Sequence, residues 1–261
     1  MSCTLRALAF ICALPLLLTV AANPATAGGP AFINRTVAGA NSANASSWLA
    51  GAHAGYNWQQ GAAVFGFETD FQGLHLSSSM NGGLQANPPP LFPGEVAGTN
   101  ASIDWYGTFR GRLGTTFGSF LAYITAGVAY GNVELTSSVS AVGLNTLVQV
   151  VEPRIGGVGG FGFEYIVKPN VMLTFAYQYV DLGRISASSS TVGGPFGCCA
   201  LSQTASVHAH FQTAMIGFSY RFAPDGSGSP WAGGYGGLHG GGAWGNNTNA
   251  LYSGSALLTT Q

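Results

Sequence analysis

Hydrophobic and polar residues alternate with a period of two along much of this chain. In the segment 63–73, Phe65 and Phe67 share one face with other apolar residues, while Glu68 and Asp70 share the opposite face. Successive side chains of a β-strand point to opposite faces of the sheet. The alternation therefore predicts strands that have one aromatic face and one polar face.

The same pattern recurs along the chain and predicts seven strands, at residues 48–58, 63–73, 104–117, 120–131, 155–167, 171–182 and 206–222. Tight turns follow the first, third and fifth strands. Stretches rich in Gly, Ser and Asn separate the others and are predicted as long loops, at 74–103, 132–153 and 183–205. Alternating short turns and long loops are typical of outer-membrane β-barrels, which have an even number of strands. We therefore assign an eighth strand to the aromatic, Gly-rich segment 231–245, for which a disordered Gly-rich tail is the alternative.

Composition supports a membrane protein over a soluble domain. Charged residues make up 7% of the chain, against roughly 25% in ordinary soluble domains. The net charge of −1 provides no basic patch for a phosphate backbone, so nucleic acid is not an expected partner. Intrinsic disorder is also excluded, because it requires low hydrophobicity and high charge.

The N-terminus predicts export through a cleaved signal peptide. Arg6 supplies the positive charge, residues 8–22 the apolar core, and Ala25-Thr26-Ala27 the small-residue cleavage site. No later stretch approaches the roughly 20 apolar residues of a membrane-spanning helix. The predicted organisation is a signal peptide at 1–27, a flexible segment at 28–47, a barrel at 48–245 and a flexible segment at 246–261.

Two cysteines, Cys198 and Cys199, lie after the signal peptide, and they are adjacent. Adjacent cysteines cannot join distant segments, so no disulfide framework is expected. Either a vicinal disulfide or two free thiols fits the sequence, and we favour an oxidised pair at a loop tip. Metal binding by two cysteines alone is not expected.

Six stretches in this order resemble the alphaproteobacterial outer-membrane β-barrel family, which is porin-like and related in architecture to the OmpA transmembrane domain. They are Ala52–Gln59, Val64–Gly73, Asp104–Gly114, Tyr123–Gly131, Tyr177–Gly183 and Ile216–Phe222. The resemblance implies an all-β fold, an eight-stranded antiparallel up-and-down barrel that spans the outer membrane of a Gram-negative bacterium.

One departure from the family concerns the order of the strands. Family members usually begin with a strand close to W-x-G-x-Y-x-G, which here comes last, at 231–245. We interpret this as a circular permutation. In the family, the ending that Phe218, Tyr220 and Phe222 resemble is the terminal signal for the barrel-assembly machinery, which is therefore an expected partner.

Charged residues on the predicted inward faces are balanced: three acids and three bases. They are Glu68, Asp70, Arg110, Arg112, Glu164 and Arg221. Side chains fill the interior of an eight-stranded barrel, and buried charges must be paired. We therefore predict an internal salt-bridge network, with a charged constriction of a narrow pore as the alternative.

Catalytic and metal-binding residues are not evident in the sequence. His208 and His210 fall by parity on the lipid-facing side, and no acid stands near them in the chain. Nucleophilic catalysis requires a base that a third group orients, so no enzyme activity is expected. His53, His75 and His239 lack metal-ligand spacing, and no cofactor is expected.

The sequence thus predicts a structural, surface-exposed outer-membrane protein. Its loops after Gly73, Gly131 and Gly183 would contact a host or environmental ligand, and its barrel would contact outer-membrane lipid and lipopolysaccharide. A narrow porin for small solutes is the first alternative. A soluble, lipocalin-like periplasmic carrier, whose aromatic face would turn inward, is the second.

Overall fold

The computed structural model describes residues 31–83, 96–141, 144–193, 199–222 and 229–260. The predicted signal peptide and Cys198 lie outside these residues, and the side chain of Cys199 is not described. Among the described residues, no helix is long and apolar enough to cross a membrane.

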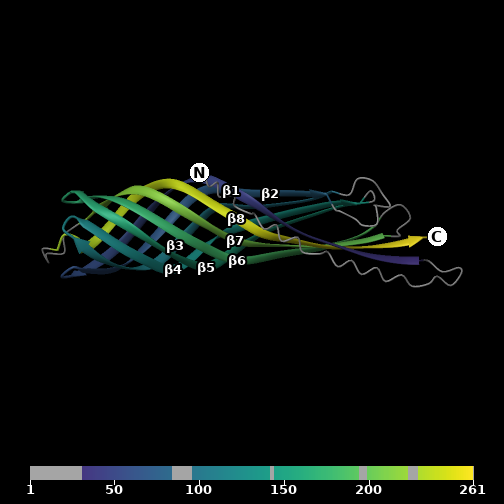
Figure 1. Ribbon diagram of the computed structural model, residues 1–261, viewed down its shortest axis with the longest axis horizontal. Coiled ribbons are helices and arrows are strands. Elements are labelled where there is room, and N and C mark those ends of the chain that lie inside the picture. Colours follow the sequence, from purple (N-terminus) through teal and green to yellow (C-terminus); the bar gives the residue numbers. More distant parts are fainter. Residues whose placement is uncertain (1–30, 84–95, 142–143, 194–198, 223–228, 261) are drawn as a thin grey trace, which may run out of the picture.

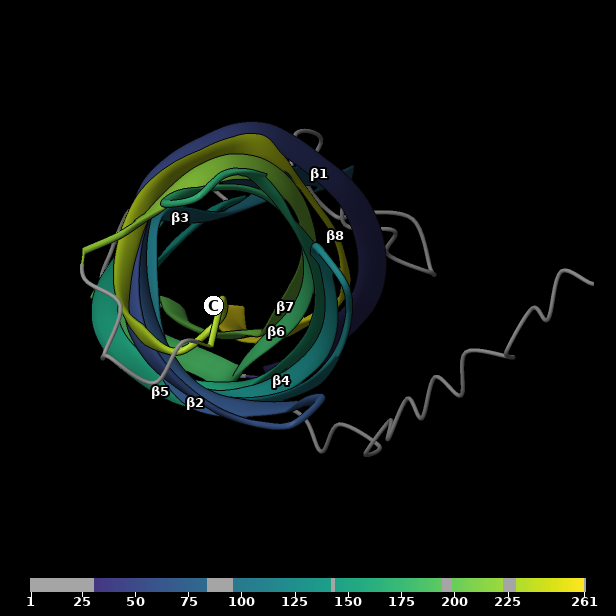
Figure 2. The same ribbon diagram turned by 90° about the vertical axis from the view of Figure 1, so that its left-hand side faces the viewer.

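Eight antiparallel strands form a closed barrel in which each strand pairs with its neighbours in the sequence and β1 pairs with β8. Figure 1 shows them running along the molecule, and Figure 2 shows the ring from one end. The predicted eight-stranded antiparallel barrel is therefore confirmed. The strands are β1 (Ala31–Gln60), β2 (Ala63–Gly83), β3 (Val96–Phe117), β4 (Phe120–Ala141), β5 (Leu144–Lys168), β6 (Val171–Gly193), β7 (Cys199–Arg221) and β8 (Gly233–Thr260).

Four connections lie together at one end of the barrel, which we call the turn end. Gly61 and Gly118 adopt positive φ angles of 61° and 63° in two of these turns, a conformation that costs glycine little. The opposite end, which we call the extended end, contains the start of β1 and the end of β8, since Ala31 pairs with Thr260.

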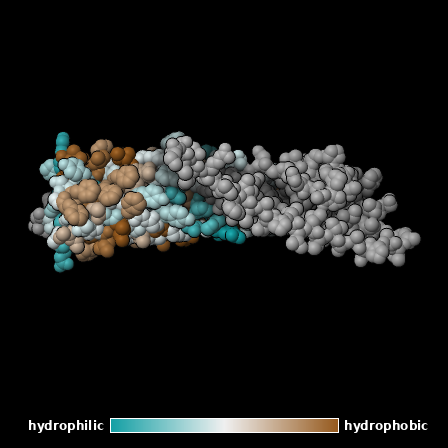
Figure 3. All heavy atoms as spheres, viewed as in Figure 1, coloured by the Kyte–Doolittle hydropathy of each residue, from teal (hydrophilic) through white to brown (hydrophobic). Residues whose placement is uncertain are grey.

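Near the turn end, the barrel wall is apolar outside and polar inside. On β2, the outward Phe65, Phe67 and Phe71 are exposed, while the inward Glu68 and Asp70 are buried. Brown, hydrophobic residues accordingly cover much of this part of the surface in Figure 3. This is the arrangement of a barrel in lipid, and it contradicts the lipocalin-like alternative, in which the aromatic face would be buried.

Toward the extended end, the same strands reverse this arrangement. Without a change of parity in β2, the inward positions become apolar at Leu74 and Leu76, and the outward positions become polar at His75 and Ser77. On β4, Val133 and Leu135 are likewise buried. The barrel therefore continues beyond its lipid-facing band as an extension with an apolar interior and a polar surface.

This extension corrects the predicted loops and flexible segments. Much of 74–103, 132–153 and 183–205 belongs to strands, as do residues 31–47 and 246–260 of the two segments predicted to be flexible. The prediction failed because Ser, Gly and Asn favour loops, whereas residues such as Ser77 and Ser102 alternate with inward apolar residues in the strands.

The wall of the extension consists of two groups of strands. The β1–β2 ladder reaches only as far as the pair Leu49–Leu74, and the β5–β6 ladder as far as Gly157–Asp181. Beyond these pairs, the ladders β2–β3–β4–β5 and β6–β7–β8–β1 continue. One apolar cluster, which includes Leu135 of the first group, joins the two. The extension thus consists of two groups of paired strands that share one apolar core.

Candidate functional site

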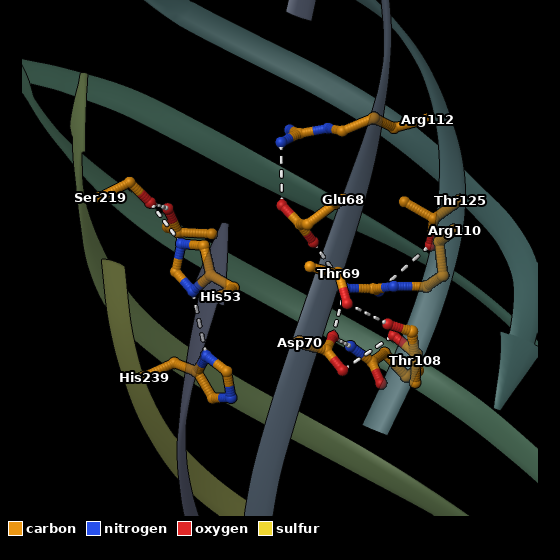
Figure 4. A network of polar contacts seen from close by, with 12 residues as sticks. His53, Glu68, Thr69, Asp70, Thr108, Arg110, Arg112, Thr125, Ser219 and His239 are labelled. Carbon is orange, nitrogen blue, oxygen red and sulfur yellow. Dashed lines mark hydrogen bonds and ion pairs between the residues drawn. The ribbon is translucent and has the colours of Figure 1, made fainter. Parts of the chain in front are cut away.

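Five of the six predicted lumen residues lie together inside the barrel near the turn end. Glu68 and Asp70 come from β2, Arg110 and Arg112 from β3, and Glu164 from β5. Period-two spacing points each pair of residues inward, and the register sets Glu68 opposite Arg110. Arg110 therefore meets two carboxylates of β2, and Arg112 lies between a carboxylate of β2 and one of β5. Figure 4 shows the carboxylates of β2 beside both arginines.

The two guanidinium groups join the carboxylates into one network. Arg110 Nη2 lies 2.5 Å from Glu68 Oε1 and 2.6 Å from Asp70 Oδ2. Arg112 lies 3.1 Å from Glu68 Oε2 and 2.7 Å from Glu164 Oε1. All five residues are buried. Arg suits this role because its planar fork can donate to several acceptors at once.

Neutral residues complete the network, and sequence analysis missed them. Tyr235 donates its hydroxyl to Glu68 Oε2 at 2.7 Å and also contacts Arg112. The Arg112 guanidinium lies 3.9 Å from the centre of the Tyr123 ring, a cation–π contact. Asp70 accepts hydrogen bonds from Thr108 at 2.8 Å and Gln178 at 3.2 Å. Inward parity could have indicated these residues, but the sequence does not show which strands face one another across the lumen.

Beside this network lies a second cluster that links β1, β6, β7 and β8. His53 Nε2 lies 2.7 Å from Ser219 Oγ, and His53 Nδ1 lies 3.1 Å from His239 Nδ1. Thr174 Oγ1 lies 3.0 Å from the same serine oxygen. Figure 4 shows His53 between Ser219 and His239. These histidines are far apart in the chain, so only the closed barrel brings them together.

A small cavity lies between the two clusters. It is lined by residues that include His53, Asp70, Arg110, Gln178 and His239, and about 20 Å³ of it is accessible to water. That volume is enough for about one water molecule. The cavity is too small for an organic substrate. It has room for water that hydrates the network, and we do not interpret it as a binding pocket.

Arg221, the sixth predicted residue, lies apart from the network. Its guanidinium donates to the backbone carbonyls of Pro169, Ser229 and Pro230, at distances of 2.9, 3.1 and 2.6 Å. Arg221 therefore connects two of the turns at the turn end. Its inward parity is as predicted, but its partners are backbone oxygens instead of carboxylates.

Apolar layers lie on both sides of the polar clusters along the barrel axis. On the turn side, Leu121, Met172 and Trp231 belong to a buried apolar cluster. On the extended side, the core of the extension begins with residues such as Tyr106 and Phe211, whose rings are 4.9 Å apart. The charged groups are therefore enclosed by side chains and do not line an open channel.

The histidines on the outer surface have partners that the sequence did not indicate. His208 Nε2 lies 3.0 Å from Asp181 Oδ1, and His75 Nδ1 lies 2.7 Å from Asp104 Oδ1. No acid is near His208 in the chain, but the β6–β7 register brings Asp181 to it in space. Among the described residues, no group of three or more His, Cys, Asp or Glu side chains could hold a metal ion.

The predicted assembly-signal residues lie on the outside of β7 and directly after it. Phe218, Tyr220 and Phe222 are exposed, on the lipid-facing side of the wall near the turn end. The backbone N–H of Phe222 donates to the carbonyl of Gly234 at 2.9 Å, which aligns the end of β7 with the start of β8.

Comparison with known proteins gives consistent matches. The sequence model of the outer membrane protein beta-barrel domain matches residues 7–222. The chain is 31% identical over 196 residues to the 31 kDa outer-membrane immunogenic protein of Brucella melitensis, covering 72% of each chain. It is 31% identical over 129 residues to a 22 kDa outer membrane protein of Rhizobium leguminosarum, covering 49% of each. It is also 27% identical over 106 residues to the outer membrane protein PagN of Salmonella typhimurium, covering 40% of this chain and 43% of that protein.

Proposed function

Because the chain belongs to the outer membrane β-barrel family, we propose that it is a structural protein that displays its extension on the cell surface, without catalysis. The outer membrane of a Gram-negative bacterium is the location of the barrel. Short turns of such barrels face the periplasm and long connections face outward. The extended end is therefore the external end.

The observation that carries this proposal is the reversal of polarity along the strands. Outward residues are lipid-compatible at Phe67 and Phe71 but polar at His75 and Ser77, only a few residues further along β2. The apolar cluster that includes Leu76 and Leu135 packs the interior of the extension. A packed core lets the strands continue beyond the lipid-facing band, as display at the surface requires.

The lumen argues against the porin alternative. Arg112 is held between Glu68 and Glu164 and against Tyr123. Apolar clusters lie on both sides of this network. A permeating ion would have to break buried ion pairs and cross apolar layers, so the network is better suited to stabilising the barrel.

The relatives' names fit exposure at the surface. Two Brucella proteins that this chain resembles are called outer-membrane immunogenic proteins, of 31 kDa and 25 kDa. By analogy, the extension and its loops would meet molecules of a host or of the environment. Lipopolysaccharide around the barrel and the barrel-assembly machinery are the other partners that we propose.

We also propose that the barrel is circularly permuted relative to its family. The family match ends at Phe222, and β8 lies wholly beyond it. β1 starts and β8 ends at the extended end. An opened external loop and a new periplasmic link between β7 and β8 would account for both observations.

The display proposal is tested by epitope insertion. A tag placed between β2 and β3, within residues 84–95, should bind an impermeant antibody on intact cells. The matched control is the same tag after Gly118, in the turn between β3 and β4, which should bind only after permeabilisation. Labelling of the Gly118 tag on intact cells, or of neither tag, would overturn the proposed orientation. Ion conductance in planar bilayers would instead favour the porin.

A further inference from the structure

A group of basic side chains lies on the outer wall where the lipid-facing band meets the extension. Arg184 of β6 stands opposite His208 of β7, and Asp181 stands opposite His210. Their neighbours Leu182 and Ile185 are buried in the interior, so the alternation turns these side chains outward. We call Arg184, His208 and His210 the basic cluster.

Local geometry positions the cluster. The β6–β7 register shifts between Asp181 and Arg184, and Gly183 there has a φ of 80°. Asp181 Oδ1 accepts the Gly183 N–H at 2.8 Å and lies 3.0 Å from His208 Nε2. The centroids of the His208 and His210 rings are 5.2 Å apart. Asp181 thus orients one imidazole, while Arg184 has no carboxylate within ion-pair distance among the described residues.

Aromatic residues place the cluster at the level of lipid headgroups. The Tyr179 ring centroid lies 6.3 Å from that of His210. Gln212 Oε1 of β7 accepts hydrogen bonds from Tyr177 OH of β6 at 2.7 Å and from Trp244 Nε1 of β8 at 3.2 Å. Outward Tyr and Trp side chains mark the interfaces of a membrane barrel. Arg184 and His208 lie further toward the extended end than these aromatics, where headgroups are found.

Two glycines leave the wall beside the cluster without large side chains. Gly157 and Gly159 of β5 stand opposite Asp181 and Tyr179 in the register. A Cβ at Gly157 would meet nothing within 4 Å. Ile155 precedes these glycines on β5, Tyr179 stands opposite Gly159 on β6, and both are exposed. These outward residues form an apolar strip, here called the Gly157–Gly159 strip, that runs from the cluster into the lipid-facing band.

We propose that the basic cluster and the Gly157–Gly159 strip together bind one phosphate-bearing lipid of the outer leaflet. Arg184 would hold the phosphate through its forked donors, and the two histidines would donate from the adjacent strand. An acyl chain of the same molecule would lie along the Gly157–Gly159 strip. The position of the cluster at the level of the headgroups favours a lipid over a soluble anion, and so does the apolar strip beside it. The proposal rests on the outer-membrane location and on the proposed orientation with the extended end outside, but not on display to a host.

The experiment measures lipid binding to the full-length mature protein, folded in detergent micelles, by native mass spectrometry. Diphosphoryl lipid A is the probe and phosphatidylcholine the zwitterionic reference. Arg184→Gln should weaken lipid A binding about fivefold, the effect of one cation near an anionic headgroup, and leave phosphatidylcholine binding unchanged. Arg184→Lys should retain most of the affinity. Gly157→Leu should weaken lipid A binding although it leaves the charge intact.

Lys168, which is exposed at the turn end, provides the matched control. Lys168→Gln removes the same charge far from the cluster and should not change lipid A binding. Equal losses in the Arg184 and Lys168 variants would overturn the proposal, because they would show non-specific charge attraction. Displacement of lipid A by equimolar inorganic phosphate would also overturn it, since the site would then bind soluble anions. Only variants with heat-modifiable gel mobility are compared. The double variant His208→Gln/His210→Gln should also weaken lipid A binding, and unchanged binding would overturn the role of the histidines in the site.

Discussion

Replacing Arg112 by Met should destabilise the barrel more than any comparable surface change. Arg112 makes ion pairs with Glu68 at 3.1 Å and Glu164 at 2.7 Å, and the side chains of all three are almost fully buried. The network of three carboxylates and two guanidinium groups has a formal charge of −1, which the substitution changes to −2. Glu68 retains Arg110, but Glu164 loses its ion-pair partner.

The expected magnitude follows from the buried charge that is left behind. Breaking a buried ion pair by removing one partner costs about 3–5 kcal/mol, whereas replacing both partners by apolar groups is often neutral. Arg112→Met should therefore lower the free energy of unfolding by about 3–5 kcal/mol. The double variant Arg112→Met/Glu164→Leu should recover about 2 kcal/mol or more of this loss.

The assay is urea unfolding of the barrel in lipid vesicles, followed by tryptophan fluorescence and by heat-modifiable gel mobility. Arg154→Met is the matched control, because Arg154 pairs with Glu152 at 2.6 Å while both side chains remain partly exposed. That variant should change the free energy by about 0–1 kcal/mol. If Arg112→Met costs no more than the control, or if the double variant is less stable than Arg112→Met, the reasoning about uncompensated burial is wrong.

Three further predictions concern other parts of the molecule. Phe109→Arg, in the lipid-facing band, should cost about 2–4 kcal/mol, while Ser77→Arg on the extension should stay within about 0.5 kcal/mol; equal costs in vesicle unfolding would refute the polarity reversal. Leu135→Ala should cost about 2–5 kcal/mol through a cavity in the extension core, and resistance of that variant to protease equal to wild type would contradict a packed core. His53→Ala should lower stability by about 0.5–1.5 kcal/mol, because Ser219 loses one buried hydrogen-bond partner and keeps Thr174; an unchanged urea midpoint would show that the Ser–His contact contributes nothing.

Much of the fold was predictable because a lipid environment imposes a strict pattern on sequence. Only helices and closed barrels satisfy backbone groups in lipid, so period-two alternation with outward aromatics such as Phe67 and Phe163 leaves few architectures. The tight turns and the need for an even strand number then indicated eight strands, including β8. The extension was not predictable in the same way, because residues such as Ser77 and Ser102 favour loops and strands of reversed polarity equally well.

The candidate site was likewise predictable in part. The alternation within each strand is a local property. It was enough to predict that five charged side chains point inward, those of Glu68, Asp70, Arg110, Arg112 and Glu164. Which inward residues touch depends on register and barrel closure, and these are set by pairings between strands that are distant in the chain. The sequence by itself thus determined the membrane location, the barrel and the polar interior. Only the tertiary structure decided that Tyr235 joins the ion pairs, that His53 contacts His239 and Ser219, and that Arg221 donates to backbone carbonyls and not to carboxylates. Each of these contacts joins segments that are distant in the chain, and the alternation pattern does not specify which distant segments lie close together in space.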